Sequence, residues 1–191
     1  NAAGRMSTPD LAARLLLAND EVMADEARAL AQQLDGENIR RQEEEAEILA
    51  AARKVVQTDP EVGARAVLVV AGEGWHRGVI GIVASKLVDA FHRPAIVLSV
   101  EDGVAHGSCR SIPHFDMLAA LEFCAPFFIR FGGHKQAAGL TMDATRIREF
   151  RSVINDRAEG LLGPEQLMPR LRIDSDLGFR AITSQVAAGI A

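Results

Sequence analysis

The first sixty residues carry a helical pattern of apolar and polar positions. A helix start is expected at Pro9-Asp10, and helical spacing continues over residues 21–57, where Gly36 permits a break or a kink. Over 37–57 the apolar stripe is narrow, and Arg40/Glu44 and Arg41/Glu45 are spaced for ion pairs one helical turn apart. This segment is typical of a solvated amphipathic helix lying on a domain surface or bridging two domains.

After residue 60 the pattern alternates between strands and helices. Apolar and β-branched runs predict two strands buried on both faces, and two further strands and three helices follow from period and turn residues. The expected strands are 66–71, 95–100, 104–111 and 139–142, and the expected helices are 78–91, 115–124 (capped by Pro113 or His114) and 145–161. We therefore predict an α/β fold, a central mixed β-sheet flanked by helices and preceded by a long helical connector.

Three parts follow from this pattern. Residues 1–62 form a helical connector, residues 63–163 form the α/β domain, and residues 164–191 begin a further segment. In that last part a short strand is expected at 170–174 and a helix at 179–191. Because the chain opens with Asn1 and stops within a helical pattern, we expect a piece of a longer protein.

Composition narrows the class of protein. No apolar run approaches the ~20 residues that a membrane span needs, and two cysteines without metal-ligand spacing argue against a disulfide scaffold or a structural zinc site. A soluble cytoplasmic protein with no membrane contact is expected. The net charge of −5 comes from residues 1–60, whereas all five histidines lie within 61–142. An anion would therefore bind locally in the middle third of the chain.

Glycine-rich segments mark the places where chemistry is expected, because open sheets bind ligands where strands meet loops. In 72–78, His76 and Arg77 precede a helix, whose first N–H groups favour a phosphate. In 107–111, Ser108 and Arg110 project to one face of a strand and suit a phosphate clamp, while Cys109 faces the other way.

The third segment is 132–139. Gly132 and Gly133 let backbone N–H groups approach an anion, and His134 is placed to donate to it. For each segment the plainer interpretation is an ordinary turn or a surface ion pair. Together they indicate a chain that holds a phosphate but is poorly equipped to cleave one, since neither thiol has a triad partner and no paired-carboxylate metal centre is present.

Four stretches carry a family resemblance. GWHRGVIGIVASKL, RPAIVLS, GSCRS and RFGGHKQAAG together resemble the DHH-associated domain of RecJ-type single-stranded-DNA-specific exonucleases, which are DHH phosphoesterases. The likeness covers nearly the whole chain, and it implies that residues 1–62 comprise the end of the family's catalytic DHH domain and its connecting helix. It implies that substrate phosphate binds at Ser108, Arg110, Gly132, Gly133 and His134, and more loosely at His76, Arg77 and Arg5 near the same cleft.

The resemblance also implies what lies outside the chain. The family's metal-binding aspartate and Asp-His-His motifs belong to an upstream domain, which in the full-length enzyme would bind Mn²⁺ or Mg²⁺, and an OB-like domain would follow. We therefore expect no metal site and no catalytic residue here. The expected function is the substrate-binding part of a metal-dependent 5′→3′ exonuclease of DNA repair and recombination, inactive as a fragment. Its expected partner is single-stranded DNA with a 5′ phosphate, and a single-stranded-DNA-binding protein or a helicase is a candidate protein partner.

Three alternatives stay open from the sequence. The first is a relative that degrades short oligonucleotides or cyclic dinucleotides, although the Trp75-His76 loop and the connecting helix speak against it. The second is a non-catalytic nucleic-acid-binding module, and the third is a plain α/β domain whose glycine loops are only turns.

Overall fold

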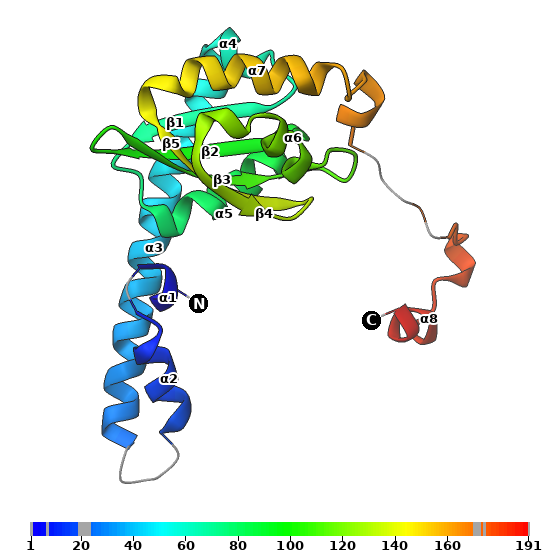
Figure 1. The fold of residues 1–191 in the computed structure, drawn as a ribbon. Coiled ribbons are helices and arrows are strands. Elements are labelled where there is room, and N and C mark those ends of the chain that lie inside the picture. The colour runs from blue at the N-terminus through cyan, green and yellow to red at the C-terminus, as the bar shows by residue number, and fades with distance from the viewer. Residues whose placement is uncertain (1, 7, 19–23, 170–172, 174, 191) are drawn as a thin grey trace.

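A five-stranded mixed sheet forms the centre of the molecule (Figure 1). The structure, a computed structural model, describes residues 2–6, 8–18, 24–169, 173 and 175–190. The strands are β1 Leu68–Glu73, β2 Ala95–Glu101, β3 Val104–Arg110, β4 Phe128–Gly133 and β5 Ala137–Asp143. Their order is β1-β2-β3-β5-β4, with β1 and β2 parallel and every other pair antiparallel. The predicted fold class is confirmed.

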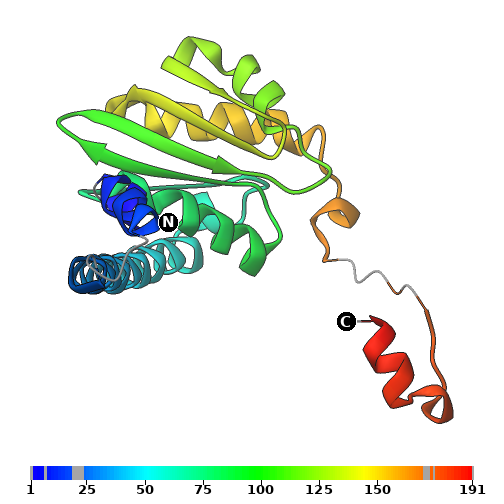
Figure 2. The ribbon, with the colours of Figure 1, turned by 90° about the horizontal axis from the view of Figure 1, so that it is seen from below.

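Helices cover both faces of this sheet. The helices in the described part of the chain are α1 Ala3–Met6, α2 Asp10–Leu17, α3 Ala24–Thr58, α4 Pro60–Gly63, α5 Arg77–Phe91, α6 Met117–Phe123, α7 Ile147–Glu159 and α8 Ser184–Ile190. Short 3-10 turns span Ala125–Phe127, Ala144–Arg146, Pro164–Leu167 and Phe179–Ala181. Figure 2 shows α3 and α5 on one side of the sheet and α6 and α7 on the other. None of the helices in the described ranges combines the length and hydrophobicity that a bilayer crossing requires.

Side chains alternate between two apolar clusters because successive residues of a strand point to opposite faces. In β1, Leu68 and Val70 pack with α5 and α3, while Val67, just before the strand, and Val69 pack on the α6/α7 side. Both strands β1 and β2 are therefore buried on two faces, which explains their continuous apolar sequence.

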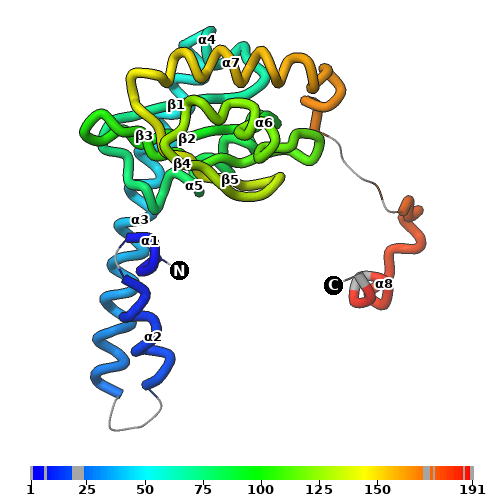
Figure 3. The backbone as a smooth tube through the Cα atoms, viewed as in Figure 1, coloured from blue at the N-terminus to red at the C-terminus, as the bar shows by residue number. Residues whose placement is uncertain are grey.

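The connector is one unbroken helix. The kink allowed at Gly36 does not occur, and α3 runs for 35 residues with α1 and α2 beside it (Figure 3). A single glycine costs about 1 kcal/mol in a helix relative to alanine, and the good helix formers around Gly36 offset that cost. The predicted pairs of Arg40 with Glu44 and of Arg41 with Glu45 are both present. Buried Glu45 also pairs with Lys86 and so ties α3 to α5.

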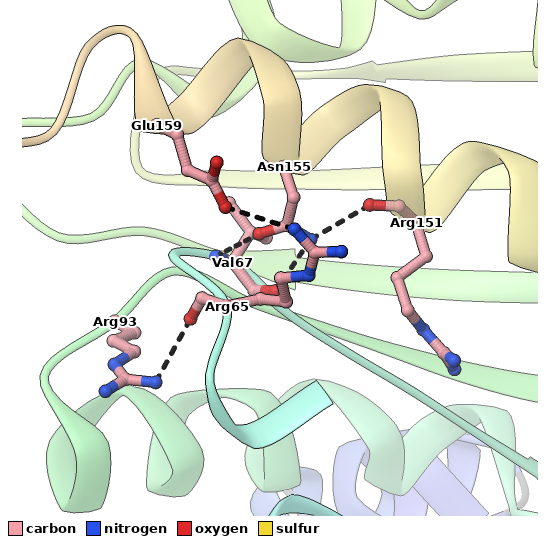
Figure 4. Close-up of polar contacts among 6 residues, drawn as sticks. All are labelled: Arg65, Val67, Arg93, Arg151, Asn155 and Glu159. Carbon is pink, nitrogen blue, oxygen red and sulfur yellow. Dashed lines mark hydrogen bonds and ion pairs between the residues drawn. The ribbon is translucent and has the colours of Figure 1, made fainter. Parts of the chain in front are cut away.

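Asn155 fixes α7 to the sheet (Figure 4). Its side-chain Oδ1 accepts from the N–H of Val67 at 2.8 Å, and its Nδ2 donates to the Val67 carbonyl at 3.2 Å and to the Arg151 carbonyl at 2.9 Å. Asn155 is fully buried. It therefore pairs with Val67 as a neighbouring strand would. At the surface nearby, Arg65 pairs with Glu159, and Arg93 donates to the Arg65 carbonyl.

The structure corrects several predicted elements. Strand β4 was not predicted, because it is an edge strand with a register shift between Phe128 and Arg130 and ends in two glycines. Helix α6 is capped by Asp116, which accepts from the Ala119 N–H, and not by Pro113 or His114.

The segment after residue 163 also differs from its prediction. The single helix expected at 179–191 is a 3-10 turn followed by α8. The short strand expected at 170–174 falls almost entirely outside the described residues. The boundaries at residues 62 and 163 stay predictions.

Candidate functional site

One face of β3 carries three polar side chains in alternation. His106, Ser108 and Arg110 point to the side of α5, as the sequence predicted for the last two. Arg110 Nη1 donates to the Ser108 hydroxyl at 3.1 Å and to the Cys109 carbonyl at 2.8 Å. Cys109 points the other way and is fully buried, and that burial raises the pKa of its thiol to about 12. Like Cys124, whose pKa burial raises to about 11, it is unsuited to nucleophilic chemistry.

The register of the sheet extends this alternation into rows. Directly opposed residues of neighbouring strands place their side chains on the same face. The first row is His106, Thr141 and Arg130, the second is Ser108, Gly139 and Gly132, and the third begins with Arg110 and Ala137. Three strands thus bring polar side chains and glycines from distant parts of the chain onto one surface.

A cavity of about 420 Å³ opens over the first two rows. The strands of its floor lie at the end of the sheet away from β1, and the first turns of α5 form its wall. Its polar and glycine lining includes Arg77, His106, Ser108, Arg130, Gly132 and Thr141. Three of the predicted site residues, Arg77, Ser108 and Gly132, therefore meet in one cavity.

Two glycines keep this floor free of side chains. A Cβ at Gly132 would meet nothing within 4 Å, and one at Gly139 would meet only the Gly107 carbonyl oxygen at 3.6 Å. Neither glycine has a positive φ. Since neither packing nor backbone conformation requires glycine there, the two residues leave room for something that approaches the sheet from the cavity.

The cavity is electropositive. Arg77 pairs with Glu101 at 2.7 Å, whereas among the described residues Arg130 has no acidic partner. The pKa of His106 lies below its ordinary value of 6.5, because of desolvation first and then repulsion by Arg77 and Arg130, with Glu101 opposing. The contribution of the two arginines to this shift marks a place where an anion would be stabilised.

Arg110 lies beside the cavity, under α5. A Cβ at Gly81 would come within 3.0 Å of Ser108 Oγ and 3.1 Å of Arg110 Nη2, so this glycine makes room for both side chains. Arg110 is half-buried, and in the described part of the chain it donates to the Ser108 hydroxyl and to the Cys109 carbonyl. Within the described ranges it forms no ion pair. A half-buried guanidinium without a carboxylate needs an anionic ligand or water for its remaining donors.

The other predicted residues lie around this cavity and do not line it. Gly133 has a φ of +149°, and exposed His134 follows it, with its N–H donating to the Ala137 carbonyl at 2.8 Å. His134 therefore continues the backbone of the third row, next to the Arg110 end of β3. Arg5 donates to the Gly78 carbonyl at 3.3 Å, and its own carbonyl lies against Gly78 on α5.

His76 serves as the N-cap of α5. Its Nδ1 accepts from the Gly78 N–H at 3.1 Å, which satisfies one of the free N–H groups expected to face a phosphate. The side chain lines a neighbouring cavity with Trp75 and Glu101. The indole of Trp75 packs over Gly72 and is half-buried.

Sequence reasoning missed three cavity residues. His106 could have been found by extending the alternation of Ser108 and Arg110 by two residues. Arg130 and Thr141 had no comparable signal, because their meeting depends on the unpredicted strand β4 pairing with β5.

The chain's own residues do not fit a divalent cation. Among the residues that the structure describes, no group of three or more His, Cys, Asp or Glu side chains could hold a metal ion. The site is made of cation and hydroxyl groups, which favour an anion.

Comparisons with known proteins identify relatives of the chain. The chain is 39% identical over 190 residues to a protein of Bacillus subtilis named single-stranded-DNA-specific exonuclease RecJ, covering 98% of this chain and 24% of that protein. The protein of the same name from Escherichia coli is 34% identical over 197 residues, covering 98% of this chain and 33% of that protein. The chain thus spans about a quarter to a third of the length of these relatives.

Solved structures give the same likeness. RecJ from Thermus thermophilus in complex with Mg²⁺ superposes with a TM-score of 0.72 at 35% identity, covering 84% of this chain and 24% of that one. An exonuclease RecJ bound to manganese gives a TM-score of 0.74 at 35% identity, covering 88% and 40%. The model of the DHHA1 domain matches residues 64–160, which are 97 of the 191 residues, and the chain belongs to the DHHA1 domain family.

Proposed function

We propose that this chain is the substrate-binding part of a metal-dependent 5′→3′ single-stranded-DNA exonuclease of DNA repair and recombination. Its role is to hold the phosphate backbone of the strand, with the 5′ phosphate at Ser108 and Arg110. The relatives' name supports the substrate class, and the cationic cavity supports the kind of contact.

The observation that carries this proposal is the state of Arg110. It is half-buried, oriented by Ser108, and without a carboxylate partner in the described part of the chain. A planar guanidinium with free donors binds phosphate oxygens in pairs. Gly132, Gly133 and His134 lie on the strand and loop next to it and add backbone N–H groups and an imidazole.

Hydrolysis is assigned to the longer protein. The relatives' structures contain Mg²⁺ or Mn²⁺, and we infer that the full-length protein uses one of these ions, held by residues outside the described ranges. The chain's own residues bind and orient phosphate and carry out no bond cleavage. A single-stranded-DNA-binding protein or a helicase is the protein partner that such an activity would use, and a cytoplasmic location fits it.

Fluorescence anisotropy at low salt tests the proposal. A labelled single-stranded oligonucleotide is prepared with a 5′ phosphate and with a 5′ hydroxyl, and each is titrated with the wild-type chain, Arg110→Ala and His134→Ala. We expect tighter binding of the phosphorylated strand and loss of that difference in both variants. No product should appear when Mn²⁺ or Mg²⁺ is added.

Two results would contradict the proposal. Binding that is unchanged in both folded variants would show that these residues do not hold phosphate. Tighter binding of a cyclic dinucleotide than of a single strand would favour the short-oligonucleotide phosphodiesterase instead.

A further inference from the structure

The first row of the cavity floor is organised around a buried hydroxyl. Thr141 is 7% exposed, and its Oγ1 accepts from Arg130 Nε at 3.2 Å and lies 3.4 Å from His106 Nδ1. Thr141 lies on β5 between β3 and β4, and it therefore contacts the side chains of both His106 and Arg130 and orients them. An exposed arginine loses rotamer freedom when it is held in this way, and a ligand benefits because the group is already oriented.

The side chains of this row have no acidic partner in the part of the chain that the structure describes. In the described ranges neither Arg130 nor His106 forms an ion pair, and the nearest acidic group, Glu101, is paired with Arg77. The Nε of Arg130 is occupied by Thr141, which leaves both Nη groups free to donate. A terminal pair of N–H donors beside an imidazole matches the oxygens of a phosphate.

The distance between the first and second rows indicates how far apart the phosphates of a ligand should be. His106 and Ser108 are two residues apart on β3, so the first and second rows are separated by roughly 6.8 Å along the strands. This is close to the separation of successive phosphates in an extended single strand, and too long for the two phosphorus atoms of a pyrophosphate. In the second row, Gly132 and Gly139 carry no side chain, so neither residue blocks a ligand that spans the two rows.

We propose that His106, Thr141 and Arg130 form a second phosphate subsite, which binds the phosphate that follows the one held at Ser108 and Arg110. This inference rests on the proposed function and adds the requirement that the ligand carry two phosphates separated by one nucleoside. Arg77 on the cavity wall lies within the same electropositive field. Neither subsite contacts a base through these groups, so the preference concerns phosphate spacing.

An NMR titration of the isotope-labelled chain tests this subsite. The ligands are a thymidine dinucleotide with a 5′ phosphate (two phosphates one nucleoside apart), the same dinucleotide with a 5′ hydroxyl (one phosphate), and thymidine diphosphate (a pyrophosphate). The wild-type chain is expected to bind the first ligand about tenfold more tightly than the other two.

Substitutions assign this preference to the row. Arg130→Gln and Thr141→Val should reduce the preference to about twofold or less, and leave binding of the one-phosphate ligand nearly unchanged. Arg148→Gln is the matched control, since it removes the same charge from an exposed position of α7, on the opposite face of the sheet. With a longer strand, Arg130→Gln should also lower the slope of log affinity against log salt by about 0.7.

The outcomes separate the two proposals. If no ligand binds the wild-type chain, or if Ser108→Ala and Arg110→Ala bind as well as wild type, the proposed function fails and this inference with it. If those variants lose binding but folded Arg130→Gln and Thr141→Val keep the full preference, the second subsite is wrong and the proposed function stands. Equal binding of the pyrophosphate ligand would overturn the spacing argument alone.

Discussion

Arg110 donates to the hydroxyl of Ser108 across 3.1 Å on one face of β3, and the described part of the chain supplies no carboxylate to either residue. Substitution of an arginine affects the stability of the fold differently depending on whether the arginine forms an ion pair within the chain or only binds a ligand. Removing one member of a buried ion pair leaves the other charge without a partner and destabilises the fold. Removing an unpaired, half-buried charge instead removes the unfavourable free energy of its desolvation.

Arg110→Met should therefore separate stability from binding. We expect the free energy of unfolding to be unchanged or higher, because the methionine keeps much of the apolar stem and removes an uncompensated charge. Affinity for a 5′-phosphorylated strand should fall about tenfold or more. Urea denaturation and anisotropy measure the two quantities, with Arg148→Met as the control. A loss of several kcal/mol in stability would show that Arg110 has a structural partner.

Binding of a strand should take up a proton at His106. Desolvation, followed by repulsion from the cations Arg77 and Arg130, holds the pKa of His106 below 6.5 in the free chain, with Glu101 opposing. A bound phosphate neutralises those cations and raises this pKa, so affinity should increase as the pH falls from about 7.5 towards 6. An oligonucleotide with a 5′ hydroxyl is the ligand to use, because its phosphodiesters do not titrate in this range. His106→Gln should flatten the pH profile, and an equally steep profile in that variant would rule out this residue.

The lowered pKa of His106 also predicts that the free chain becomes less stable as the pH falls. A histidine whose folded-state pKa is lowered binds its proton more readily when unfolded, so it destabilises the fold as the pH drops through 6.5 and the effect is complete below the folded pKa. Above pH 7 it contributes nothing. The difference in unfolding free energy between wild type and His106→Gln should therefore change only below about pH 7. A difference that grows towards higher pH would contradict the assignment.

The glycines of strands β4 and β5 should differ in how substitution by alanine affects stability and binding. Gly132→Ala and Gly139→Ala meet no obstacle, so stability should stay level or rise by about 0.5–1 kcal/mol, while strand binding weakens because a methyl group enters the floor. Gly133→Ala should instead cost about 1–3 kcal/mol, since φ is +149° and the new Cβ would lie 2.4 Å from Ala138 Cα. Thermal unfolding and anisotropy on the three variants check this division. Unimpaired binding by both Gly132→Ala and Gly139→Ala would place the ligand elsewhere.

Asn155→Ala should destabilise the fold by roughly 2–3 kcal/mol, because the buried N–H and carbonyl of Val67 lose their partners. The exposed pair of Arg65 with Glu159 lies next to it in Figure 4 and supplies the comparison. Arg65→Gln should cost less than about 1 kcal/mol. Equilibrium unfolding in urea measures the loss of stability in both variants. Similar losses would show that the hydrogen bonds of Asn155 do not hold α7 to the sheet.

The sequence predicted the elements whose burial leaves a clear pattern. The apolar runs of β1 and β2 and the spacing of α5 and α7 reflect burial against neighbours on both sides. Strand β4 left no such pattern, since it lies at the edge of the sheet and most of its residues are exposed. Gly36 was ambiguous because glycine allows a break without requiring one.

The residues of the candidate site likewise differ in whether a local sequence pattern reveals them. Ser108, Arg110 and the glycines at 132 and 133 were found because each lies within a short local motif. His106, Thr141 and Arg130 form one row only through pairing of three strands, and register between strands is set by long-range packing. The contact of Arg5 with Gly78 likewise depends on how α1 and α5 meet, whereas the cap of α5 by His76 is a local contact between residues two positions apart.

Two glycines one turn apart on α5 lie against parts of the chain that are distant in sequence. Gly78 receives the backbone of Arg5 from α1, Gly81 makes room for Ser108 and Arg110, and Lys86 further along the helix forms an ion pair with Glu45 of α3. Helix α5 is therefore in contact with the N-terminal helices and with the strand that carries Arg110. A substitution that changes how the N-terminal helices pack on α5 would for this reason also alter the surroundings of that arginine.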